Sequence, residues 1–113
     1  MFEINSVMDF ENHFLDNLDE KLIVCIFSAS WCQPCKNLKE TMDRENIEYN
    51  FQRNTKFLYI DVDRNPDLSE RFDIKSLPTQ LFIKNNKVLD EIVGFNYTGF
   101  MKRLNTFSRN QSF

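Results

Sequence analysis

The chain of 113 residues is long enough for one domain of ordinary size and too short for two. Apolar residues make up 42% and charged residues 27%, a composition typical of a globular chain with a core and not of a disordered one. The formal net charge of -3 argues against nucleic-acid binding, because no basic cluster could neutralise a row of phosphates. The two glycines, Gly94 and Gly99, are too few for a phosphate-binding or dinucleotide-binding loop.

No apolar stretch approaches the length of a membrane span, and the first residues lack the basic and apolar regions of a secretory signal. We therefore expect a cytoplasmic protein that does not associate with a membrane. In that reducing compartment, a Cys-x-x-Cys sequence is more often catalytic or metal-binding than a structural cross-link.

Strands and helices alternate in the first half of the chain. Residues 2–7 suit a short strand, and residues 9–18 carry apolar side chains at helical spacing. Residues 21–27 form a continuous apolar run, as expected of a strand covered on both faces. A polar-faced helix follows, which begins with residues 33–35 and runs to about residue 49.

The same alternation continues beyond residue 50. Residues 57–62 predict a second buried strand, and residues 67–72 predict a short helix for which Pro66 is a favourable start. The following strands, 79–83 and 88–93, form a hairpin.

Asn85 and Asn86 lie between those strands, and asparagine tolerates the positive φ of a tight turn. The order β-α-β-α-β-α-β-β-α predicts an α/β fold, with a mixed sheet of four to five strands flanked by helices on both faces.

The C-terminal end predicts one more helix and a tail. Apolar residues recur at helical spacing at Phe95, Phe100, Met101 and Leu104. From Thr106 onward the sequence resembles a frayed polar end. We place one domain at residues 1–107 and a polar tail at residues 108–113.

The loop between the apolar strand and the next helix contains two cysteines, Cys32 and Cys35. Such a loop lies at the carboxyl edge of the sheet, where α/β proteins commonly carry their sites. Cys32 would lie at the start of the helix, where unpaired N–H groups and the helix dipole lower the pKa of a thiol. Cys35, three residues later, would return to the same side of the helix. We expect Cys32 to be ionised and accessible to solvent.

This pair predicts thiol–disulfide exchange. The Cys32 thiolate would attack a substrate disulfide, and Cys35 would resolve the mixed disulfide to leave a Cys32–Cys35 bond. Pro34 fixes its φ and would stiffen the small ring.

A structural zinc site is the main alternative for the cysteine pair. Tetrahedral zinc needs four ligands, and the only further candidates are Cys25 and His13. Cys25 lies in the apolar run and is best interpreted as a small buried hydrophobe. His13 is interpreted as a surface residue of an early helix, without a functional role. We therefore expect no metal.

Several segments of the chain resemble the thioredoxin family. Residues 31–36, Trp-Cys-Gln-Pro-Cys-Lys, resemble the family's active-site run Trp-Cys-x-Pro-Cys-Lys, and residues 27–30 match the stretch before it. Residues 62–66 resemble the family's Val-Asp-x-Asn-Pro, and residues 74–79 resemble its Ile-x-x-x-Pro-Thr loop. Residues 93–94, Val-Gly, fall where the family has its late glycine. These segments occur in the family's order over nearly the whole chain.

The resemblance implies a thioredoxin fold and a reductase of protein disulfides that needs no cofactor. It implies that Pro78 follows a cis peptide bond and faces the dithiol. The backbone of Leu77 would pair with an extended substrate segment. Trp31, Leu77 and Gly94 would form a flat apolar contact around Cys32.

Three positions depart from the family. Its buried aspartate, thought to move the proton of the resolving thiol, is Ile26 here, and a nearby lysine is Tyr59. Loss of the aspartate should stabilise the fold and slow release of the mixed disulfide, because a buried carboxyl without compensation is costly. Gln33 replaces the glycine between the cysteines.

Three functions remain open from the sequence. The first is a monomeric disulfide reductase, recharged by a thioredoxin reductase or another electron donor. The second is an oxidase or isomerase of protein disulfides. The third is a non-catalytic binding module of the same fold. The intact cysteine pair favours an enzyme, and the absence of a signal sequence favours the reductase.

Overall fold

The continuous apolar run forms the central strand of the sheet. In the computed structural model, which describes residues 1–109, this strand is β2 (Leu22–Ser28), and every residue in it is buried. From residue 22 to residue 27, even-numbered side chains join the core on one face of the sheet and odd-numbered ones join the core on the other. An apolar run without polar alternation therefore reflects burial on both faces, as predicted.

Four further strands complete the sheet. They are β1 (Phe2–Glu3), β3 (Thr55–Asp61), β4 (Thr79–Lys84) and β5 (Lys87–Val93). The spatial order is β1-β3-β2-β4-β5, with β1, β3 and β2 parallel and with β4 and β5 joined antiparallel to them. The predicted α/β fold with a mixed sheet is confirmed.

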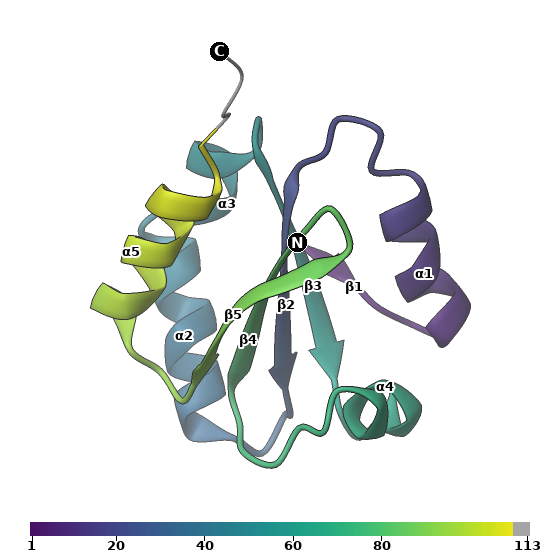
Figure 1. Ribbon diagram of the computed structural model, residues 1–113. Helices are drawn as coiled ribbons and strands as arrows, with labels where there is room; N and C mark the ends of the chain where they lie inside the picture. Colours follow the sequence, from purple (N-terminus) through teal and green to yellow (C-terminus); the bar gives the residue numbers. More distant parts are fainter. Residues whose placement is uncertain (110–113) are drawn as a thin grey trace.

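Helices cover both faces of this sheet (Figure 1). They are α1 (Val7–Leu15), α2 (Gln33–Arg44), α3 (Ile47–Phe51), α4 (Pro66–Arg71) and α5 (Tyr97–Phe107). Residues of α2, α3 and α5 share one core with the sheet, and residues of α1 and α4 share the other. Within residues 1–109, none of these helices has the length and apolar character needed to cross a bilayer.

The first strand is shorter than the predicted 2–7. Ser6 ends it by capping α1, since the Ser6 Oγ accepts a hydrogen bond from the Asp9 N–H at 3.0 Å. The Asp9 carboxylate accepts one in return from the Asn5 N–H at 2.9 Å. This capping box takes up backbone groups near the start of the helix. The helix ends at Leu15, three residues before the predicted end.

The prediction of one continuous helix up to residue 49 is also wrong, because two helices occupy this stretch. Asn46 adopts φ 54° and ψ 40°, in the left-handed region, and separates α2 from α3. Asparagine tolerates this conformation better than most residues, so the break needs neither glycine nor proline. Ile47, directly after it, is buried in the same core as α2.

The hairpin turn is confirmed, with φ of 53° at Asn85 and 63° at Asn86. At the C-terminal end, α5 includes Thr106 and Phe107, so a frayed end from Thr106 is wrong. Ser108 is also buried, and the Lys84 Nζ donates a hydrogen bond to the Phe107 carbonyl at 3.2 Å. The last four residues of the predicted tail, 110–113, lie outside the described residues.

Candidate active site

Cys32 and Cys35 form a disulfide at the start of α2, where the chain leaves β2. Their Cα atoms lie 5.3 Å apart. Cys32 is the N-cap of the helix, and its sulfur accepts a hydrogen bond from the Cys35 N–H at 3.3 Å. The structure thus confirms that the two sulfurs meet and that Cys32 lies at the positive end of the helix dipole.

The expected solvent access of Cys32 is wrong for this disulfide form. The exposed fraction is 6% for Cys32 and 2% for Cys35. The two cysteines form a small core cluster with the buried Ala29, and the partly buried Val62 and Leu77 pack against it. Cys32 nevertheless keeps the larger exposed fraction of the two residues.

A groove of about 480 Å³ runs beside the disulfide. Its lining includes Cys32 and Pro34 from the cysteine loop and Ile74 and Leu77 from the loop before β4. Trp31 also lines it and is 68% exposed, so it is not a core tryptophan. Its indole Nε1–H donates a hydrogen bond to the Asp63 carboxylate at 2.9 Å, which fixes the ring at the edge of the groove.

The loop facing the disulfide contains a cis peptide bond between Leu77 and Pro78, as the resemblance implied. Two hydrogen bonds hold this loop: Thr79 Oγ1 donates to the Ser76 carbonyl at 2.6 Å, and the Gly94 N–H donates to the Pro78 carbonyl at 2.7 Å. Within residues 1–109, the N–H and C=O of Leu77 have no such partner. Gly94 and the buried Pro78 do not line the groove.

Gly94 has a conformational reason to be glycine. Its φ is +88°, a value that side chains disfavour, while a Cβ at this position would meet no atom within 4 Å. Backbone conformation therefore accounts for the residue, and its N–H supports Pro78.

An apolar side chain, Ile26, lies in the core shared with α2 at the position where the family carries its carboxylate. Ile26 is 1% exposed and lies opposite Tyr59 in the strand register. The Tyr59 hydroxyl and the Ser28 Oγ share a hydrogen bond of 2.5 Å, and the Lys39 Nζ lies 5.1 Å from the centre of the Tyr59 ring. Sequence reasoning missed this hydroxyl pair, although the alternation of β2 places residues 26 and 28 on one face.

Cys25 and His13, the other residues considered as zinc ligands, lie in different surroundings from the disulfide. Cys25 is a fully buried free cysteine in the apolar core, and this burial raises the pKa of its thiol. The ring of His13 packs on Phe2 at 4.8 Å, and burial and the nearby Lys56 lower the pKa of the imidazole. Within residues 1–109, no three or more potential ligands gather as a metal site would require.

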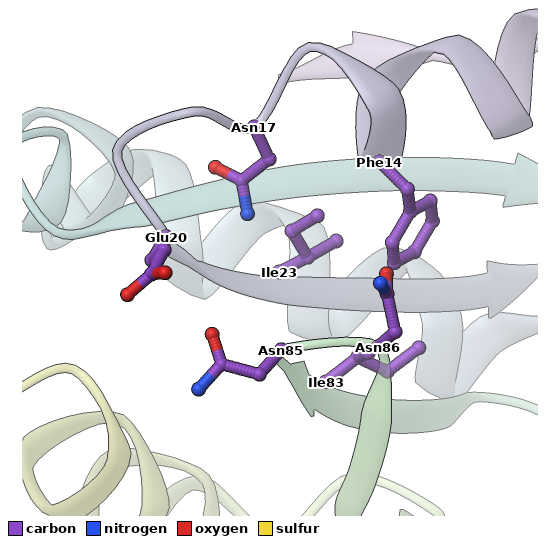
Figure 2. A pocket seen from close by; sticks show the side chains of 7 residues that line it. All are labelled: Phe14, Asn17, Glu20, Ile23, Ile83, Asn85 and Asn86. Atoms are coloured by element: carbon purple, nitrogen blue, oxygen red, sulfur yellow. The ribbon is translucent and has the colours of Figure 1, made fainter.

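A second hollow lies at the opposite end of β2 and β4 (Figure 2). It is lined by Phe14, Asn17, Glu20, Ile23, Ile83, Asn85 and Asn86. Asn17 uses its side chain to bind the backbone of Lys21 twice, at 2.9 and 3.1 Å. The lining contains neither cysteine nor histidine, so this hollow offers no redox chemistry of its own.

Comparisons with known proteins agree with this geometry. The family model for thioredoxin matches residues 3–106. Thioredoxin-1 of Drosophila yakuba is 34% identical over 94 residues, which are 83% of this chain and 85% of that protein. The thioredoxin of Ictalurus punctatus is 36% identical over 91 residues, which are 80% of this chain and 84% of that protein.

The fold comparison gives the same result. The X-ray structure of Fasciola hepatica thioredoxin has a TM-score of 0.85 and 28% identity, and the match covers 95% of this chain and 99% of that one. The chain belongs to the thioredoxin family and is a thiol–disulfide oxidoreductase.

Proposed function

We propose that the protein reduces disulfides of other proteins in the cytoplasm, with Cys32 as the attacking thiol and Cys35 as the resolving thiol. The observation that carries this assignment is the asymmetry of the pair. Cys32 caps α2 and keeps the larger exposure, whereas Cys35 is enclosed within the first turn. A helix N-terminus stabilises a thiolate, and the thiolate is the nucleophile in exchange.

The reaction then has two exchanges. The Cys32 thiolate attacks one substrate sulfur, a Cys32–substrate bond forms, and the other substrate sulfur leaves as a thiolate. The Cys35 thiolate next attacks the Cys32 sulfur and displaces the second substrate sulfur. Two electrons pass to the substrate, and the Cys32–Cys35 disulfide remains.

The groove beside the disulfide would hold the substrate. Trp31 and Leu77 supply its apolar surface next to Cys32. The unpaired N–H and C=O of Leu77 suit an extended segment that adds as a strand. Pro78 would shape this loop, and Gly94 would support it from behind through its hydrogen bond.

A reduced partner must return two electrons after each cycle. A thioredoxin reductase or another dithiol donor fits this role, because it would present a thiolate to the same groove. We place the catalytic domain at residues 1–107 and expect the monomer to be the working unit.

Reduction of insulin disulfides tests the assignment. Replacement of the nucleophile, Cys32→Ser, should lower the rate about a thousandfold or more, to background. Cys35→Ser should instead accumulate a mixed disulfide between Cys32 and the substrate. The matched control is Cys25→Ala, which removes the buried thiol and should retain activity. Normal turnover by Cys32→Ser, or loss of it in a folded Cys25→Ala, would contradict the assignment.

A further inference from the structure

One buried side chain near the dithiol has an unused hydrogen-bonding atom. Gln80 is 0% exposed, and its Nε2 donates a hydrogen bond to the Gly94 carbonyl at 3.2 Å. Its Oε1 accepts no hydrogen bond from any group in residues 1–109. A buried acceptor without a partner destabilises the protein, so an orphan of this kind points to a donor supplied in another state.

Gln80 lies on the face of the sheet that α2 covers. It pairs with Ile26 in the antiparallel register of β2 and β4, and paired residues point to the same face. Phe82, two residues further along β4, belongs to the core shared with α2 and α5. Gln80 is therefore directed toward the layer formed by α2, α3 and α5.

Cys35 approaches the same region from above the sheet. It lies one turn before Leu38 on the buried side of α2, and Leu38 shares a core with Ile26. The carboxyl end of β2, the start of β4 and the start of α2 meet at this edge. Gln80 is the second residue of β4, and Cys35 is in the first turn of α2, so both residues lie toward this edge of the sheet.

The redox state decides whether Cys35 can donate. In the disulfide, its sulfur carries no hydrogen, so it offers nothing to the Gln80 amide. Reduction by two glutathione thiols breaks the S–S bond, adds two electrons and two protons, and yields glutathione disulfide. One proton then resides on Cys35, and a thiol is a weak donor suited to a carbonyl oxygen.

We propose that Gln80 is a positioning residue for the resolving thiol, whose Oε1 accepts a hydrogen bond from Cys35 in the reduced protein. This inference rests on the proposed function and assigns it a residue in place of the family's carboxylate. The bond satisfies the Gln80 oxygen only after reduction, so it favours the dithiol over the disulfide. It also holds the Cys35 sulfur near Cys32 between cycles.

The equilibrium with the glutathione couple tests the proposal. Gln80→Met keeps a similar volume without the amide, and it should shift the equilibrium about three- to tenfold toward the Cys32–Cys35 disulfide. Two losses act in this direction: the reduced form loses its hydrogen bond, and the disulfide form loses its orphan oxygen. An unchanged constant would overturn the proposal, and so would a shift toward the dithiol. An unchanged equilibrium constant is the result expected if a water molecule, and not Cys35, donates to the Gln80 Oε1 in both the disulfide and the dithiol forms.

Thr55 provides a matched control. Its Oγ1 is the other buried side-chain oxygen without a partner in residues 1–109, and it pairs with Leu22 at the opposite end of β2. Thr55→Val removes that orphan away from the dithiol. It should leave the glutathione equilibrium unchanged, and a shift as large as that of Gln80→Met would show a general effect of core polarity instead.

Gln80→Met also removes the hydrogen bond to the Gly94 carbonyl, so the equilibrium alone does not isolate the bond to Cys35. A second measurement therefore observes the Cys35 thiol directly. In a Cys25→Ala, Cys32→Ser protein, Cys35 is the only thiol. Its Raman S–H band should lie below the frequency of a thiol without a hydrogen bond, and a band at that free frequency would refute the proposal. If the wild-type cysteines fail to interconvert with glutathione at all, the proposed function fails. If they do and Gln80→Met behaves as wild type, only the role of Gln80 fails.

Discussion

At the carboxyl end of β2 the chain places two cysteines, and at the amino end of the same strand it places Asn17 and Glu20 beside the hairpin turn (Figure 2). Both ends are hollowed and both carry polar side chains. At the hairpin end, Asn17 is committed to the backbone of Lys21. At the dithiol end, the bond between the sulfurs can break and re-form. The comparison shows that the chemistry of the lining, and not the presence of a hollow, identifies the active end.

The two ends of β2 also differ in whether a buried oxygen without a partner could receive a hydrogen bond when the redox state changes. Gln80 lies on the half of β4 that pairs with the carboxyl end of β2, where the cysteine loop begins, whereas Thr55 pairs with Leu22 at the amino end of β2. Substitutions at the dithiol end should therefore alter redox behaviour, and substitutions at the hairpin end should alter stability alone.

Among the substitutions that test this difference between the two ends, Ile26→Asp should have the largest effect on stability and turnover. The new carboxyl would be buried among mostly apolar side chains, so we expect the free energy of unfolding at neutral pH to fall by about 2–4 kcal/mol. A carboxylate near Cys35 should also accept its proton and accelerate turnover roughly tenfold. Chemical denaturation and insulin reduction measure the two effects. Unchanged kinetics near neutral pH would refute a proton-transfer bottleneck at this position.

The loss of stability in Ile26→Asp should depend on pH. Burial raises the pKa of the folded carboxyl above its unfolded value, so the folded protein binds more protons between the two values. The penalty is smallest below the unfolded pKa and grows as pH rises through the window up to the folded pKa. Ile26→Asn serves as the control, because it buries a polar group that does not titrate and should show a constant penalty.

A smaller effect is expected at the hairpin end from Asn17→Ala. The variant loses both hydrogen bonds to Lys21 and should lower the free energy of unfolding by about 1–2 kcal/mol. The glutathione equilibrium should stay at the wild-type value. Asn12→Ala, on the exposed side of α1, is the matched control and should change neither quantity. A redox shift in Asn17→Ala would break the separation between the two ends.

The smallest effect is expected from the turn itself. Asn86 has φ 63°, so Asn86→Gly should raise the free energy of unfolding by about 0.5 kcal/mol, with activity unchanged. Asn86→Ala should have the opposite sign, because an ordinary side chain disfavours this φ. Thermal denaturation of both variants measures the difference. Equal stability of the two would argue against conformational control of the turn.

Local patterns in the sequence were sufficient for much of the fold. The apolar run predicted a strand buried on both faces, and Asn85-Asn86 predicted the hairpin turn, whereas the cis bond before Pro78 was implied by the resemblance to the family. The strand and the turn each depend on residues close together in the chain. The break at Asn46 and the early end of β1 were missed, because neighbouring hydrogen bonds and packing decided them.

The sequence alone determined that Cys32 and Cys35 lie at the start of a helix that follows a buried strand, because strand, loop and helix are consecutive in the chain. Only the tertiary structure decided how far the two cysteines are buried and which buried polar atom is left without a partner. Those properties come from Leu77 and Gln80, more than forty positions along the chain. Burial and hydrogen-bond partnership depend on which distant strands and loops meet, and no local spacing encodes that encounter.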